Sequence, residues 1–238
     1  MRRVLVTRPE PGASQTAHRL AAAGFVPLLL PLFETHSLFV DGGSIPDTIG
    51  AVAVSSANAI RHAPRELVER LAARPCFAVG EKTAETARAA GFLHVREGRG
   101  DAEALARTIM AAGPVGTVVY LCGRVRRPTF EAMLVAADVA VRAIETYNTI
   151  GIDYEAGPAI QVLGGLPVDA ALLYSAAAAE ALTKLLDRPE FADLFENTAF
   201  FCMSARVAGA LETTGRGKIR VAKEPTEDAL LSLLGKSG

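Results

Sequence analysis

The residues of this chain best suited to chemistry are hydroxyls, glycines and cations that directly follow short apolar runs. The clearest run is TVVYLC (117–122), which ends at Gly123 and is followed by Arg124, Arg126 and Arg127. Equivalent positions after other apolar runs are Thr7, Arg8, Ser55, Ser56, Asn58, Gly80, Lys82, Thr83, Ser175, Ala176 and Ser204. Guanidinium groups, hydroxyls and free main-chain amides are the groups that hold carboxylates and phosphates. The pattern therefore predicts the binding of an anion.

Capping of helices is the alternative interpretation of these serines and threonines. A hydroxyl before a helix commonly accepts a hydrogen bond from a main-chain N–H of the first turn. For any single position capping is the simpler explanation. Because the carboxyl ends of parallel strands meet at one edge of a sheet, several such ends together favour binding. Arg8 and Arg124 are expected to bind the anion, whereas Arg126 and Arg127 are expected to be solvated or to provide a diffuse positive field at the rim of the site.

Several other classes of site have no support in the sequence. The net charge is -1, which provides no basic field for nucleic acid. No GxGxxG or GxxxxGK[ST] motif is present, and the predicted strand ends contain no Ser-His-Asp set and no closely spaced carboxylate pair. The histidines (18, 36, 62 and 94) form no ligand pair, and three widely spaced cysteines (76, 122 and 202) predict buried free thiols. We therefore expect no metal and no cofactor.

The apolar segments also argue against a membrane protein. The longest strongly apolar run spans residues 25–33 and is interrupted by Pro27 and Pro31, so it is too short for a bilayer. The residues that follow Met1 indicate a strand and not a signal peptide. A cytoplasmic protein that binds neither membranes nor nucleic acid is expected.

The elements that would position these residues alternate along the chain. Residues 4–6 and 25–30 are predicted as strands, and 14–23 as a helix that ends at Gly24. Apolar strands that alternate with helices are typical of an α/β fold, in which helices cover parallel sheets. We predict two such domains.

An internal repeat defines the predicted domains. Segments 51–60, 76–91 and 100–109 match segments 170–182, 200–215 and 226–234 in the same order. The first copy continues through 118–144, and its counterpart is the N-terminal segment 3–30, which aligns Arg8 with Arg124. The sequence thus predicts an inserted domain of residues 38–145 and a discontinuous domain of 1–32 plus 152–238. Residues 33–37 and 146–151 would form a two-stranded hinge, with the anion in the cleft between the domains.

These segments resemble the uroporphyrinogen-III synthase family over essentially the full chain. The matching elements are VLVTRPEPGASQTAHRLAAAGF, VSSANA, FAVGEKTAETARAAGF, YLCGRVRRPTFEAML, ETYNT, LLYSAAAAEA and TEDALLSLL. The resemblance implies a lyase that acts on 1-hydroxymethylbilane, a linear tetrapyrrole with eight carboxylates. Loss of water, ring closure and inversion of ring D would give uroporphyrinogen III. The family uses no cofactor.

The resemblance also implies roles for individual residues. The tyrosine of ETYNT is Tyr147, which becomes the candidate general acid for the leaving hydroxyl. A packing role at the hinge is the alternative for Tyr147. Positions that map onto the substrate cleft of the family are Ser55, Ser56, Thr83, Ser175 and Ser204. The alanines at 176–179 depart from the family pattern, so only main-chain N–H groups could bind there.

Two other functions fit the same predicted architecture. A two-domain binding module with a hinged anion-binding cleft would share it, as would a nucleotide-sugar glycosyltransferase. The absence of a signal peptide, a DNA-binding segment and a nucleotide signature counts against them. We expect a monomer that acts on a small molecule.

Overall fold

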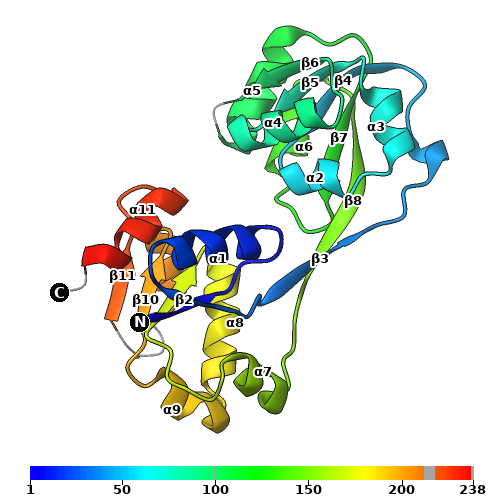
Figure 1. Cartoon of the computed structure of the whole chain (residues 1–238). Coiled ribbons are helices and arrows are strands. Elements are labelled where there is room, and N and C mark those ends of the chain that lie inside the picture. Colours follow the sequence, from blue (N-terminus) through cyan, green and yellow to red (C-terminus); the bar gives the residue numbers. More distant parts are fainter. Residues whose placement is uncertain (99, 212–217, 237–238) are drawn as a thin grey trace. The chain divides into compact units, whose positions relative to one another are not determined.

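The chain forms two compact units, which a computed structural model describes over residues 1–98, 100–211 and 218–236 (Figure 1). Unit 1 comprises Met1–Glu34 and Ile150–Gly238, and unit 2 comprises Thr35–Thr149. Each unit contains its own sheet and its own apolar core. Within the described residues, no helix is both long and apolar enough to cross a membrane.

Unit 1 is built on a five-stranded parallel sheet. Its strands are β1 (Arg3–Val6), β2 (Val26–Leu29), β9 (Ala170–Leu173), β10 (Ala199–Cys202) and β11 (Lys218–Val221). The strand order is β11-β10-β9-β1-β2, and Val4 of β1 is in register with both Pro27 and Ala170. β1 therefore lies inside the sheet, between β2 from the N-terminal segment of unit 1 and β9 from its C-terminal segment.

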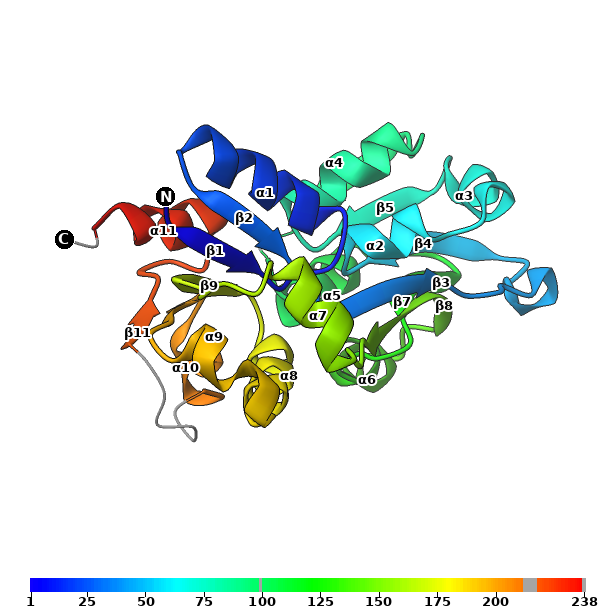
Figure 2. The same ribbon diagram turned by 60° about the horizontal axis from the view of Figure 1, so that its bottom comes forward.

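Helices cover both faces of this sheet. The helices of unit 1 are α1 (Gly12–Ala22), α7 (Ala156–Val162), α8 (Ala176–Leu186), α9 (Ala192–Phe195), α10 (Ala205–Gly209) and α11 (Glu227–Ser232), with 3-10 turns at Pro189–Phe191 and Leu234–Lys236. Leu20 of α1 and Leu230 of α11 pack with Val4 and Val6 on one face. Leu182 of α8 packs with Leu5 on the other face. Figure 2 shows α1 on one side of the sheet and α8, α9 and α10 on the other.

Unit 2 is built on a six-stranded sheet. Its strands are β4 (Ile49–Val54), β5 (Pro75–Ala78), β6 (His94–Glu97), β7 (Thr117–Gly123) and β8 (Val141–Gly151), with β3 (Phe33–Ser37) at one edge. The order is β3-β8-β7-β4-β5-β6, and β4 to β8 are parallel. Leu38 donates to Thr146 and Ile152 donates to Leu32, so β3 runs antiparallel to β8.

The helices of unit 2 also lie on two faces. They are α2 (Ala57–Arg61), α3 (Arg65–Leu71), α4 (Glu81–Ala89), α5 (Ala102–Ala112) and α6 (Thr129–Ala136), with a 3-10 turn at Gly42–Ser44. Residues of α2, α3 and α4 pack with Val52 and Val119. Residues of α5 and α6 pack with Ala53 and Tyr120 on the opposite face. The predicted α/β fold of parallel sheets flanked by helices is confirmed.

The strand orders support the predicted internal repeat. When β4, β5, β6, β7 and β8 are matched with β9, β10, β11, β1 and β2, the two sheets have the same order. The pairs β4/β9, β5/β10, β7/β1 and β8/β2 are those that the sequence comparison aligned. The comparison did not identify β6 and β11, whose sequences HVRE and KIRV contain too many charges for an apolar run.

Candidate functional site

Tyr147 lies against a glycine of the neighbouring strand. The register between β7 and β8 shifts after Cys122, which pairs Gly123 with Tyr147. A β-carbon at Gly123 would lie 2.6 Å from Cζ of Tyr147 and 2.9 Å from its hydroxyl oxygen. The phenol ring therefore crosses the Cα of Gly123, and a side chain at this position would displace it.

The arginine segment after β7 is bound to the same strand. The main-chain N–H of Arg124 donates to the carbonyl of Tyr147 at 2.8 Å, and its side chain donates to Glu145 at 3.1 Å. The side chain of Arg124 remains 56% exposed. A hydrogen bond from Arg126 and one from Arg124 lower the pKa of Glu145, so this carboxylate is ionised at neutral pH. The ionised Glu145 thus orients the side chain of Arg124, which remains accessible to solvent.

Arg126 differs from the sequence-based expectation. It was expected to be solvated or to provide a diffuse positive field, but its side chain is only 23% exposed and ion-pairs with Glu145 and Glu131, each at 2.9 Å. Its guanidinium also donates to the carbonyl of Gly123 at 3.2 Å. Carboxylates from β8 and α6 surround it, and the sequence did not reveal that they would meet. Arg127 is exposed, as expected.

The end of β4 contributes Ser55, Ser56 and Asn58. The Ser55 hydroxyl lies 2.7 Å from the hydroxyl of Tyr120 on β7. Burial raises the pKa of Tyr120 to about 12. Ser56 caps α2 by accepting from the N–H of Asn58, whose side-chain oxygen in turn accepts from Arg61. Capping therefore explains Ser56, whereas Ser55 points to a neighbouring strand.

The end of β5 contributes Gly80, Lys82 and Thr83. Gly80 precedes α4 in an extended conformation, and its carbonyl accepts from the N–H groups of Thr83 and Ala84. Lys82 is exposed and Thr83 is buried. Since β5, β4 and β7 are adjacent and parallel, these residues and Arg124 share one edge of the sheet of unit 2.

Arg8 occupies the corresponding place in unit 1 but already has partners. Its guanidinium ion-pairs with Glu227 at 3.1 Å and lies 4.3 Å from the ring centroid of Tyr174. Glu227 also accepts from Thr16 and Tyr174 and ion-pairs with Arg19. Burial acts to raise the pKa of Glu227, but these hydrogen bonds and positive charges outweigh it and lower the pKa. Arg8 therefore links β1 to the C-terminal helix α11.

The other predicted residues of unit 1 lie at the ends of β9 and β10. Ser175 caps α8 by accepting from the N–H of Ala178, and Ala176 is the first residue of that helix. Ser204 precedes α10, and its side chain makes no capping hydrogen bond. Unit 1 thus contains Arg8, Ser175, Ala176 and Ser204, and the other predicted site residues belong to unit 2. That the two sets share one cleft stays a prediction.

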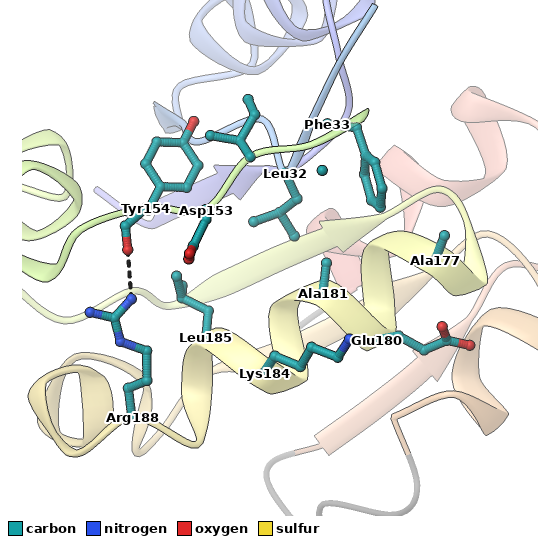
Figure 3. A pocket seen from close by; sticks show the side chains of 12 residues that line it. Leu32, Phe33, Asp153, Tyr154, Ala177, Glu180, Ala181, Lys184, Leu185 and Arg188 are labelled. Carbon is teal, nitrogen blue, oxygen red and sulfur yellow. Dashed lines mark hydrogen bonds between the residues drawn. The ribbon is translucent and has the colours of Figure 1, made fainter. Parts of the chain in front are cut away.

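Unit 1 also contains a cavity of about 630 Å³ that sequence reasoning missed (Figure 3). Its walls include the apolar side chains of Leu32, Phe33 and Leu185, together with Lys184 and Arg188. Arg188 donates to the carbonyl of Tyr154. Glu180 and Lys184 of α8 are four residues apart, which was the available signal for a polar helix face, and Arg188 follows the end of that helix.

The buried thiols were predicted correctly. Cys76, Cys122 and Cys202 are free and buried. Burial raises the pKa of Cys76 and Cys122 to about 12 and that of Cys202 to about 11. Among the described residues, no group of three His, Cys, Asp or Glu side chains could hold a metal ion.

Comparison with known proteins identifies the family. A family model described as uroporphyrinogen-III synthase HemD matches residues 14–232. The chain belongs to the uroporphyrinogen-III synthase family. Uroporphyrinogen-III synthases are cofactor-independent cyclising lyases of tetrapyrrole biosynthesis. The family resemblance noted in the sequence indicated the same activity.

Solved structures of this family share the fold. The uroporphyrinogen-III synthetase of Helicobacter pylori is 17% identical, with 98% of each chain covered and a TM-score of 0.63. A mutant uroporphyrinogen III synthase of Thermus thermophilus is 17% identical, with 99% of this chain and 97% of that chain covered and a TM-score of 0.55. A search among curated proteins gave no significant match.

Proposed function

We propose that this chain converts 1-hydroxymethylbilane to uroporphyrinogen III and that Tyr147 protonates the hydroxyl group that leaves. The observation that carries the activity is the match of the uroporphyrinogen-III synthase family over residues 14–232. Within the chain, the contact between the Tyr147 ring and Gly123 supports the role of Tyr147, because it fixes the phenol at the end of β7.

The chemistry requires one proton transfer to the leaving group. The phenol of Tyr147 gives its proton to the hydroxyl oxygen as the C–O bond breaks, and water departs from the bilane. Closure with inversion forms a C–C bond from the freed methylene carbon to the substituted α-carbon of ring D, and the bond from that α-carbon to its bridging methylene then breaks. The bridge re-forms at the free α-carbon of ring D, whose proton returns to the phenolate of Tyr147. Inversion of ring D requires that direct closure is blocked, so the chain must hold the bilane in one conformation.

Anion binding at the strand ends of unit 2 is the proposed means of holding the bilane. Arg124 offers an exposed guanidinium, and the amides at the starts of α2 and α4 offer partial positive charge. Ser55, Ser56, Asn58, Gly80, Lys82 and Thr83 complete this proposed surface. In unit 1, we propose main-chain and hydroxyl contacts at Ser175, Ala176 and Ser204. Arg8 has a smaller part, because its charge is matched by Glu227.

An isomer assay tests the activity. Hydroxymethylbilane is generated in situ, the protein is added, and the oxidised uroporphyrin I and III isomers are separated. We expect a shift from isomer I to isomer III. Isomer I alone, from folded protein, would instead favour a binding module with an anion-binding cleft.

The role of Tyr147 has a separate test. Tyr147→Phe keeps the ring but removes the proton, so kcat should fall by about 10- to 100-fold. Unchanged kcat would leave Tyr147 with a packing role only. The expectations of a cytoplasmic monomer that binds no nucleic acid belong to the same proposal, and light scattering checks the monomer.

A further inference from the structure

The ring of Tyr147 has a second neighbour, the imidazole of His62. His62 directly follows α2 and is partly buried. The centroids of the two rings are 5.9 Å apart, and their planes are tilted by 33°. This separation lies within the range in which aromatic side chains attract one another. Sequence reasoning considered His62 only as a metal ligand, so this contact was not foreseen.

The imidazole of His62 is itself held in place by other elements of unit 2. Its Nδ1 lies 2.9 Å from the hydroxyl of Ser37, at the end of β3. Its main-chain N–H donates to the carbonyl of Asn58 at 3.0 Å. The ring is therefore fixed from β3 and from α2 at the same time.

A buried hydrogen bond fixes α2 to the strand that contains Tyr147. The hydroxyl of Thr146 donates to the carbonyl of Ala59 at 2.7 Å, and Thr146 is fully buried. The carbonyl of Thr146 accepts from the N–H of Leu38 at 2.9 Å. Strands β3 and β8 and helix α2 are thus joined immediately beside the phenol, so a shift of one would move the others.

We propose that His62 is a positioning residue, which holds the phenol of Tyr147 in its reactive orientation while Ser37 orients the imidazole. This inference rests on the proposed function, in which Tyr147 delivers the proton. Gly123 has no side chain, so it cannot restrain the ring of Tyr147 by side-chain packing. The imidazole supplies a second contact, which restricts rotation of the phenol away from Gly123.

The effect requires the ring of His62 and not its charge. Burial, followed by the nearby charges of Arg61 and His36, lowers the pKa of His62, so the imidazole is neutral at neutral pH. An aromatic ring without an ionisable group should therefore preserve the contact. This distinguishes positioning of Tyr147 from acid–base chemistry by His62 itself.

The test compares kcat, KM and melting temperature of His62→Ala, His62→Phe and Ser37→Ala, each alone and in the Tyr147→Phe background. His94→Ala is the control, since His94 is exposed on β6, at the opposite edge of the sheet from β3. We expect His62→Ala to lower kcat by about 10-fold, with KM and melting temperature nearly unchanged. His62→Phe should recover most of the rate, and Ser37→Ala should cost about 3-fold.

The Tyr147→Phe background shows whether His62 acts through the phenol. Once the hydroxyl is gone, His62→Ala should cause no further loss, because coupled residues are not additive. A loss of the same size in both backgrounds would overturn the inference, as would wild-type kcat in His62→Ala. If His62→Ala does not fold, losses in His62→Phe and Ser37→Ala that are as large in the Tyr147→Phe background as in wild type would overturn it. Slow Tyr147→Phe with unaffected His62 variants refutes only this inference, whereas fully active Tyr147→Phe removes the proposed role of Tyr147 and this inference with it.

Discussion

Replacement of Gly123 by alanine should slow catalysis without unfolding the protein. The added β-carbon would lie 2.6 Å from Cζ of Tyr147, and ordinary contact begins at 3.4 Å. The ring must therefore retreat by about 0.8 Å. A displacement near 1 Å can cost about 100-fold in rate, so we expect kcat to fall by about 10- to 100-fold.

The expected effect on stability is smaller. Overpacking typically costs about 1 to 3 kcal/mol. The lower conformational freedom of alanine in the unfolded chain offsets about 0.4 to 1 kcal/mol of this. For a chain of this length each kcal/mol shifts the melting temperature by about 2 to 4 °C. The variant should therefore stay folded at 25 °C.

The assay is steady-state formation of isomer III, with melting temperatures measured in parallel. Gly42→Ala is the matched control, because nothing lies within 4 Å of a β-carbon at that position in the same unit. It should retain wild-type kcat. If Gly123→Ala turned over at the wild-type rate while Tyr147→Phe was slow, the position of the phenol would not depend on Gly123 and the argument would be refuted.

Three further outcomes follow from charges and burial. Arg124→Ala should raise KM about 2- to 5-fold, since the side chain is half exposed. Arg127→Ala, at an exposed position, should leave KM unchanged. Equal KM values in both variants would contradict a binding role for Arg124. The lowered pKa of Glu227 means that its ionised form stabilises the fold above its unfolded pKa, near 4.3, and that this contribution is lost as the pH falls through the folded pKa. Glu227→Gln should thus melt below wild type at pH 7, with the gap narrowing as the pH falls through the folded pKa; a constant gap would show that ionisation of Glu227 is not the source. Because burial raises the pKa of Cys76 and Cys122 to about 12 and that of Cys202 to about 11, a disulfide reagent should label none of them at pH 8 until denaturant is added, and rapid labelling of native protein would contradict this.

The fold could be predicted where strands are apolar and buried. β4, β7 and β9 are nearly all buried, so each forms a continuous apolar run. β6 and β11 lie at sheet edges, where every side chain of either strand is at least partly exposed, and charges break the apolar runs. The comparison of the repeats therefore did not find them, and the strand order shows their place.

The types of residue at the candidate site could be predicted from the sequence, but the contacts between them could not. Ser56 and Ser175 cap helices, as the simpler interpretation had it. The contact of Tyr147 with Gly123 depends on a local shift in register, which no spacing in the sequence encodes. The partner of Arg8 lies 219 residues away, at Glu227. Pairings of this kind depend on tertiary packing, so sequence patterns alone could not reveal them.

The insertion of β1 between β2 and β9 has a consequence for synthesis on the ribosome. Residues 1–34 emerge before unit 2, but β9, the second neighbour of β1 in the sheet, ends at Leu173. At about 5 to 20 residues per second, the intervening stretch takes roughly 7 to 28 seconds to be made. Unit 2 is uninterrupted in sequence and can fold during that interval. The apolar strands of the first 34 residues must wait for β9, so β1 stays unpaired on that side while unit 2 folds.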